Sequence, residues 1–169
     1  MILESEDIKL EKAKYEDWKD MYRNVWSHPE TAKYMEWSVT TNEEEAKLRI
    51  KRTIHFEENH DTYLVYEKQG GTAIGFAGVE MIEPKIYQEA GIALGPEYVR
   101  KGYGTQILKL LLEYCKSMGG KEFYYYSRAE NKASRRLALT CGFEFRTSER
   151  RIDSRNGESY EMLVYHKEI

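Results

Sequence analysis

The sequence predicts one mixed α/β domain in which antiparallel strands come first and a β-α-β-α-β order follows. Its 169 residues suit a single domain, and 41% hydrophobic residues are enough to fill a core. Apolar residues alternate with period two in the middle of the chain and recur at helical spacing after residue 105. Three prolines and no low-complexity tract indicate no linker, so we expect one domain over residues 1–169.

The first third of the chain combines a strand with two helices. Residues 7–13 alternate polar and apolar, which predicts a short strand, and residues 15–26 carry an apolar stripe that predicts a helix ending before Pro29. Thr41 and Glu44 have the spacing of a capping box, so a second helix is predicted behind them. The basic face of this helix, which we expect to be solvated, comprises Lys47, Arg49, Lys51 and Arg52.

Strands and helices then alternate toward the C-terminus. Strands rich in branched and aromatic residues are predicted at 62–68, 73–82, 87–94 and 122–127. Amphipathic helices are predicted at 105–118, closed by two glycines, and at 131–140, capped by Asn131. Residues 142–148 and 159–166 form a closing hairpin, for which Asn156 and Gly157 predict a tight turn.

Charge and composition exclude several classes of function. Lys and Arg number 26 against 29 Asp and Glu, a net charge of −3, which argues against nucleic-acid binding. No apolar run approaches the ~20 residues of a membrane span, and the first residues do not have the pattern of a secretory signal. Two cysteines indicate free thiols and a cytoplasmic protein, and four scattered histidines indicate no metal site.

The loop before the helix at 105 is the most informative segment for chemistry. Gly102 and Gly104 let a ligand approach the backbone closely, and the first N–H groups of a helix are unpaired at its positive end. These features suit a phosphate or pyrophosphate. The spacing is neither a dinucleotide fingerprint nor a P-loop, so a plain glycine-rich turn is an equally good interpretation of this loop alone.

Two further stretches join this loop in a family resemblance. The three stretches, in chain order, are Glu89-Ala90-Gly91-Ile92, the loop from Arg100 to Gly104, and Asn131, Ser134 and Leu137 followed by Gly142-Phe143. Together they resemble the Gcn5-related N-acetyltransferase (GNAT) superfamily, and most closely its ribosomal-protein N-terminal acetyltransferase branch. The resemblance implies an α+β fold with a mixed, mostly antiparallel sheet of about seven strands, splayed in the middle, with helices on both faces.

The resemblance also implies acetyl-CoA as co-substrate, an amine as acceptor, and no metal. The residues expected to bind CoA are Ile92, Ala93, Leu94, Val99, Arg100, Lys101, Gly102, Tyr103, Gly104, Thr105, Asn131 and Ser134. The candidates for general base are Glu89, at the family's glutamate position, and then Glu80 on the preceding strand; the plain interpretation of either is a solvated or ion-paired glutamate. The acceptor side is expected to include Tyr34, Glu36, Trp37 and Tyr126.

Two positions depart from the family pattern. Val99 stands where the loop usually has an Arg or Gln, and Ala138 stands where many members carry a tyrosine as general acid. The general acid is therefore unassigned, although Ser134 could donate to the leaving thiolate or simply pack under the cofactor. A catalytically inactive CoA-binding module, an enzyme that uses another acyl-CoA, and a homodimer all remain open.

Overall fold

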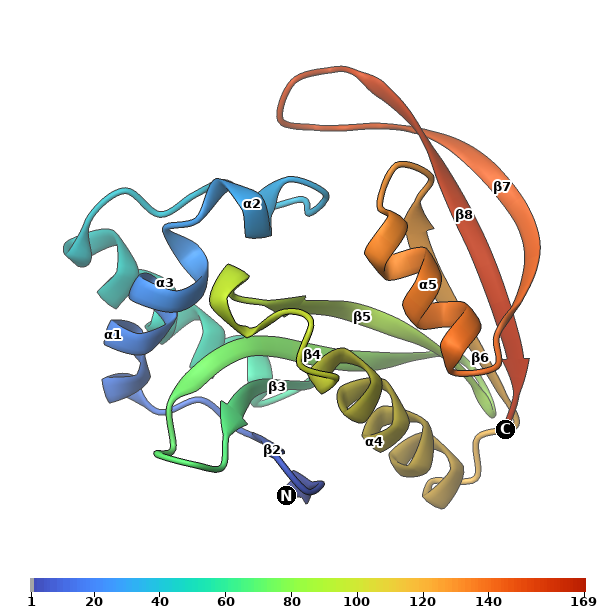
Figure 1. Cartoon of the computed structure of the whole chain (residues 1–169), viewed down its shortest axis with the longest axis horizontal. Coiled ribbons are helices and arrows are strands. Elements are labelled where there is room, and N and C mark those ends of the chain that lie inside the picture. The colour runs from blue at the N-terminus through green and yellow to red at the C-terminus, as the bar shows by residue number, and fades with distance from the viewer. Residues whose placement is uncertain (1) are drawn as a thin grey trace.

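A central open sheet of eight strands organises the computed structural model, which describes residues 2–169 (Figure 1). The strands are β1 (Leu3–Glu4), β2 (Ile8–Glu11), β3 (Asp61–Glu67), β4 (Ala73–Glu83), β5 (Ile86–Leu94), β6 (Glu122–Arg128), β7 (Glu144–Ile152) and β8 (Ser159–Glu168). Their order is β1-β2-β3-β4-β5-β6-β8-β7, and within residues 2–169 only β5 and β6 pair in parallel. The predicted mixed, mostly antiparallel sheet is confirmed, with β1 as an added strand too short to give a sequence period.

The four predicted helices lie close to their expected places, and two short helical segments, α2 and η3, are additional. They are η1 (Tyr15–Asp17), α1 (Trp18–Met21), η2 (Tyr22–Trp26), α2 (Pro29–Ala32), α3 (Glu43–Glu57), η3 (Pro96–Tyr98), α4 (Tyr103–Ser117) and α5 (Lys132–Thr140). The single helix predicted at 15–26 is one continuous helical segment. It begins as a 3₁₀ helix, continues as an α-helix and ends as a π-helix. No helix within residues 2–169 has both the length and the apolarity that crossing a bilayer requires.

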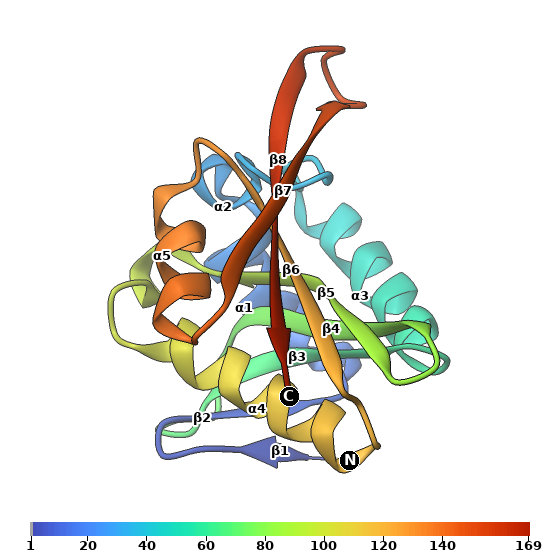
Figure 2. The same ribbon diagram turned by 90° about the vertical axis from the view of Figure 1, so that its right-hand side faces the viewer.

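Helices cover both faces of the sheet, as predicted (Figure 2). Because successive side chains of a strand point to opposite faces, β3 contributes to two cores. Tyr63 and Val65 pack in the core that also contains the buried residues of α4, whereas Leu64 and Tyr66 pack in the core that contains those of α1 and α3. The sheet is therefore the middle of three layers.

Two details of the sequence prediction are wrong. The cap of α3 is Asn42, whose Oδ1 accepts the N–H of Glu45 at 2.8 Å, whereas Thr41 Oγ1 bonds the carboxylate of Glu45. The box is therefore shifted by one residue. The β7–β8 turn is also wider than a two-residue primed turn, because Asp153 accepts the N–H of Gly157 and donates its own N–H to Glu158.

A bulge in β5 makes the sheet splay. The β4–β5 register skips between Ala77 and Val79, opposite which Gly91 adopts φ 110°. A bulge bends its strand and increases the local twist. Accordingly β5 pairs with β6 over three residues only, Ile86–Gln88 against Glu122–Tyr124, and the two strands diverge beyond that point (Figure 1). The predicted splay is thus placed at Glu89.

We expect Gly91→Ala to destabilise the fold by about 1–3 kcal/mol, because φ 110° is strained for any L-residue. The new Cβ would also lie 3.3 Å from the Phe76 ring. Gly71→Ala is the matched control, since Gly71 also has positive φ but faces open space. Urea unfolding of the two variants measures the difference. The loss should be larger at Gly91, and equal losses at both glycines would show that the contact with Phe76 adds nothing to the backbone strain.

Candidate active site

The splay opens a cleft of about 890 Å³ between β5 and β6. Its walls come from the end of β5, the loop and first turn of α4, the end of β6, and α5. The segment around α2 and the β7–β8 hairpin form the far rim (Figure 1). One cavity therefore unites parts of the chain that lie more than 100 residues apart.

Most of the residues predicted for the site line this cleft. They are Tyr34, Glu36, Trp37, Glu89, Ile92, Ala93, Leu94, Val99, Arg100, Gly102, Gly104, Thr105, Tyr126, Asn131 and Ser134. Three predicted residues lie outside the lining. Glu80 is exposed and accepts a hydrogen bond from Gln88, Lys101 lies over the Tyr98 ring, and the Tyr103 hydroxyl donates to Glu67 at 2.6 Å.

The start of α4 presents unpaired backbone donors to the cleft. The N–H groups from Gly102 to Thr105 have no hydrogen-bond partner within the described chain, and no side chain caps the helix. Gly102 adopts φ 80° as the cap residue, and Arg100 adopts φ 64° just before it. Because the positive end of a 15-residue helix coincides with these donors, the loop is built to hold an anion.

The cleft-facing edge of β5 is the second set of backbone groups. Gly95 donates its N–H to Ile74 of β4 at 2.8 Å. Since strand residues alternate in direction, the N–H and C=O groups of Ile92 and Leu94 point away from β4, toward the cleft. Beyond residue 88 no strand of the described chain pairs with this edge. An extended, amide-rich ligand can therefore add to it as a strand would.

Glu89 lies at the point where the two strands separate. Its carboxylate accepts the N–H of Gly91 at 2.6 Å, across the bulge. Burial among the diverging strands raises the pKa of Glu89 to about 7, although the N–H groups of Gly91 and Tyr126 oppose this shift. A carboxylate with a pKa near neutrality can take up a proton at physiological pH, which suits a general base.

Two hydroxyl groups meet on the α5 side of the cleft. Tyr125 and Ser134 are joined by a hydrogen bond of 2.8 Å, and both line the cavity. Burial raises the pKa of Tyr125 well above its ordinary value, so it stays protonated. Ala138, one turn after Ser134, is fully buried in the core and takes no part in the cleft. Ser134, one half of this hydroxyl pair, therefore lies one helical turn before the position where many members of the family carry a tyrosine.

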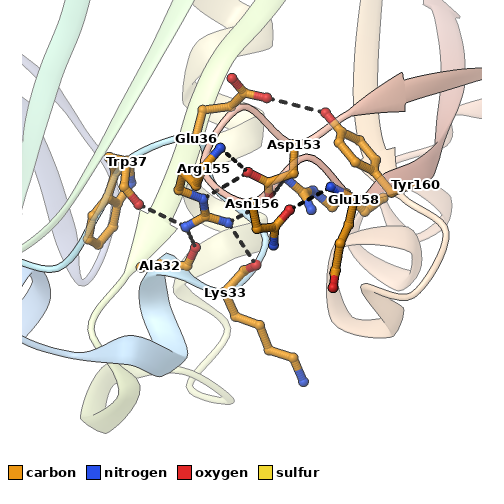
Figure 3. A network of polar contacts seen from close by, with 10 residues as sticks. Ala32, Lys33, Glu36, Trp37, Asp153, Arg155, Asn156, Glu158 and Tyr160 are labelled. Atoms are coloured by element: carbon orange, nitrogen blue, oxygen red, sulfur yellow. Dashed lines mark hydrogen bonds and ion pairs between the residues drawn. The ribbon is translucent and has the colours of Figure 1, made fainter.

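The far rim is closed by a network around Arg155 (Figure 3). Its guanidinium donates to the carbonyl oxygens of Ala32 and Trp37, each at 2.9 Å, and pairs with Asp153 at 2.9 Å. Asp153 is buried and also binds Arg128 at 3.0 Å. The tip of the β7–β8 hairpin therefore holds in place the segment that carries Tyr34, Glu36 and Trp37.

Several residues of the cleft were not predicted from the sequence. They include Phe76, Tyr125, Arg128, Arg136, Arg151, Tyr160 and Met162. Arg136 follows Ser134 in the same helix, so the motif could have indicated it, and Tyr125 stands beside the predicted Tyr126. The hairpin residues have no local signal, because their position depends on how the hairpin arches over the cleft.

Comparison with known proteins identifies the class. The family model described as "Acetyltransferase (GNAT) domain" matches residues 7–144, and the chain therefore belongs to the GNAT acetyltransferase family. Over 115 residues it is 27% identical to "Uncharacterized N-acetyltransferase p20" of Bacillus licheniformis, covering 66% of this chain and 64% of that protein. Over 88 residues it is 31% identical to "N-alpha-acetyltransferase RimI" of Mycobacterium tuberculosis, covering 50% and 53%. The matches thus span just over half to two-thirds of these relatives.

Solved structures share the fold over nearly the whole chain. A GNAT-family acetyltransferase from Bacillus anthracis superposes with a TM-score of 0.85 at 19% identity, over 99% of this chain and 98% of that one. The Salmonella typhimurium enzyme that modifies the N-terminal serine of ribosomal protein L7/L12 gives 0.82 at 19% identity, over 100% and 99%. The microcin C7 self-immunity acetyltransferase MccE, solved with acetyl-CoA and AMP, gives 0.82 at 24% identity, over 98% and 94%. The predicted superfamily is confirmed, and ribosomal-protein acetyltransferases are among the structural neighbours.

We expect Arg155→Ala to loosen the segment from Lys33 to Trp37, because it removes the donors that bind its carbonyl groups. Hydrogen exchange over residues 30–40 should accelerate by about tenfold or more, while the exchange of α4 stays unchanged. Arg150→Ala is the control on the same hairpin, since the Arg150 side chain forms a hydrogen bond to Ser159 and none to the segment from Ala32 to Trp37 among residues 2–169. Unchanged exchange in Arg155→Ala would mean that other contacts hold the rim.

Proposed function

We propose that the protein is an acetyl-CoA-dependent N-acetyltransferase that transfers an acetyl group to a primary amine by direct attack within a ternary complex. One observation carries the proposal. The unpaired start of α4, the free edge of β5 and the near-neutral carboxylate of Glu89 all face one cleft. An anion site, an amide-binding edge and a base in this order suit the pyrophosphate, the pantetheine and the reacting amine.

The chain's own groups would hold the co-substrate along the cleft. The N–H groups from Gly102 to Thr105 would bind the pyrophosphate, and Arg100 would add charge. The edge at Ile92 and Leu94 would bind the pantetheine amides. The Oδ1 of Asn131 caps α5 by accepting the N–H of Ser134. Its Nδ2 is left to donate a hydrogen bond to the pantetheine. The structural neighbour MccE has been solved with acetyl-CoA, which supports acetyl-CoA as the co-substrate.

Acetyl-CoA, when bound, supplies a thioester carbonyl that a neutral amine can attack. The N–H of Leu94 would stabilise the negative charge that develops on the carbonyl oxygen. Glu89 would accept the amine proton, directly or through water, as the carbon–nitrogen bond forms. The hydroxyl pair of Ser134 and Tyr125 would give a proton to the sulfur as the carbon–sulfur bond breaks. Holding amine and thioester together supplies a large part of the acceleration.

A CoA-binding module without catalysis is the alternative that Val99 and Ala138 favour. Release of free thiol from acetyl-CoA, measured with a panel of N-terminal peptides and small amines, separates the two functions. The proposed enzyme releases thiol in step with acetylated amine, whereas the binding module releases none. The same panel shows which primary amines serve as acceptors.

We expect CoA to stabilise the fold by about 2.7 kcal/mol at a concentration 100-fold above its dissociation constant. Gly104→Val should lower CoA affinity by about tenfold or more with little loss of stability. A Cβ at Gly104 meets Leu137 at an ordinary 3.5 Å, whereas a side chain at Gly102 would also strain the backbone at φ 80°. Calorimetric titration and thermal melting measure both quantities, with Lys116→Ala at the far end of α4 as control. Unaltered CoA binding in Gly104→Val would rule out pyrophosphate binding at the start of α4.

We expect Glu89→Gln to lower kcat by about 100-fold at pH 7 with nearly unchanged CoA affinity. Glutamine keeps the size of the side chain but cannot accept the proton. Since the Glu89 base is active only when deprotonated, kcat/KM of the parent should rise with pH through a limb near 7. In Glu89→Gln, kcat/KM should rise with pH only as the acceptor amine itself loses its proton.

The pH profile also decides between a catalytic and a structural role for Glu89. Glu80→Gln, on the exposed part of β4, is the matched carboxylate control and should retain the parent profile. A parent-like rate for Glu89→Gln at pH 7 would exclude Glu89 as the base. Loss of both CoA affinity and melting temperature would make its role structural.

A further inference from the structure

The sequence pattern predicts that Arg49 of α3 lies on a solvated helix face. In the structure this side chain instead packs against two tryptophans. Its guanidinium is enclosed between two indole rings, with centroids 4.7 Å away for Trp26 and 4.5 Å away for Trp37. Trp37 comes from the segment after α2, which folds back over the helix. A cation between two aromatic faces is attracted by both, and it is also removed from much of the water around it.

No carboxylate of the described residues forms an ion pair with this cation. Both hydrogen bonds of Arg49 come from Nη1, to Thr40 Oγ1 at 3.0 Å and to the Ser38 carbonyl at 3.5 Å. Within residues 2–169 its guanidinium forms no ion pair with a carboxylate, unlike the guanidinium groups of Arg128 and Arg155. Burial is the main cause that lowers the pKa of Arg49 to about 10. A partly desolvated charge without an ion-pair partner is costly. An anion bound here would be attracted to the guanidinium and would also offset that cost.

A second cavity of about 580 Å³ lies beside Arg49, between α3, residues 37–40 and strands β3 and β4. Trp37 Nε1 and Thr62 Oγ1 are buried without a hydrogen-bond partner among the described residues, and both side chains line this cavity. Buried polar groups normally find partners, so these two groups point to a ligand that accepts hydrogen bonds. Arg52 adds a second positive charge to the lining.

The cavity also contains two carboxylates, Glu45 and Glu57, and neither forms an ion pair with Arg49 within residues 2–169, although the charge of Glu45 opposes the lowering of the Arg49 pKa. Glu45 accepts hydrogen bonds from the N–H and the hydroxyl of Thr41, both at 3.0 Å. Glu57 accepts the N–H of Ala13 at 2.7 Å, and burial raises the pKa of Glu57 to about 7. Arg49 and Arg52 therefore line the cavity together with two carboxylates that accept hydrogen bonds from other neighbours.

The second cavity adjoins the cleft at its acceptor end. Trp37, Phe76 and Ala90 line both spaces, and Ala90 directly follows Glu89. The Trp37 and Phe76 rings meet edge to face, with centroids 6.4 Å apart. An acceptor with its amine at Glu89 can therefore extend past these rings toward Arg49.

We propose that the cavity beside Arg49 is the subsite for an oxyanion of the acceptor, so that the preferred substrate is a primary amine bearing a carboxylate or phosphate group. This inference rests on the proposed function, because it assigns the amine to Glu89. Arg49 would bind the oxyanion through Nε and Nη2, which make no hydrogen bond among the described residues, and Trp37 Nε1 would add a neutral donor. Arg49 is then a residue that determines specificity.

The test compares matched amines that differ only in their distal group. Each set contains a carboxylate, a phosphate monoester and a neutral amide on the same spacer, with spacers of increasing length. The parent should prefer an anionic member by about tenfold or more in kcat/KM. Whichever of carboxylate and phosphate shows the larger preference identifies the anion.

Arg49→Met keeps a long apolar side chain between the indole rings but removes the charge. It should abolish the preference by lowering kcat/KM for the anionic amine while the neutral amide stays within about twofold. Lys51→Met, an exposed residue of the same helix, should keep the parent preference. Arg49→Lys keeps the charge but not the planar guanidinium, so it should keep part of the preference for the anionic amine. Equal losses for anionic and neutral amines, or no preference in the parent, would overturn the subsite.

Equilibrium binding keeps this test separate from the proposed function. The N-acetylated form of each anionic amine is titrated into parent and Arg49→Met while tryptophan fluorescence is recorded, since Trp26 and Trp37 flank the site. Failure of every amine to release thiol would reject the enzyme but not the subsite. Binding that is absent, or equal in the two proteins, would reject the subsite even if acetyl transfer occurs.

Discussion

The whole site depends on one failure of strand pairing. After three parallel pairs, β5 and β6 separate because a bulge at Gly91 turns β5 away, and no other strand of the described chain takes the empty place. Unpaired backbone groups in a protein interior are costly unless a ligand or water satisfies them. The free edge of β5 can therefore pair with an extended, amide-rich ligand, and the same divergence leaves the space in which Glu89 lies.

The bulge also links the fold to the acid–base chemistry. Gly91 gives β5 its turn and, through its N–H, holds the Glu89 carboxylate at 2.6 Å. Burial between the strands raises the pKa of Glu89, whereas this N–H lowers it, and the balance lies near 7. A straight strand would leave Glu89 either paired against β6 or exposed like Glu80. The geometry that opens the cleft is thus also the geometry that gives the carboxylate a useful pKa.

How far the sequence predicts the site depends on whether backbone or side chains build it. The helix start at Gly102 and the edge at Ile92 are backbone features, and glycines and hydrophobic periodicity indicate them locally. The capping box at α3 was misplaced by one residue because Thr41 and Asn42 can both cap, and only the packed structure selects between them. Arg49 was expected in solvent because helical spacing describes one helix, and it does not describe a tryptophan that folds over it from another segment.

The acceptor side is built from side chains of distant segments, which is why local motifs do not describe it. Arg155 reaches 118 residues back to the carbonyl of Trp37, and Trp37 in turn covers Arg49. The β7–β8 hairpin, the segment after α2 and the helix α3 are therefore connected through Trp37, which lines both cavities. A common cofactor can be held by a fixed backbone, but different acceptors require different side chains. In the proposed enzyme, concentrating those side chains in one connected rim would let the acceptor specificity change while the strands proposed to hold the thioester stay as they are.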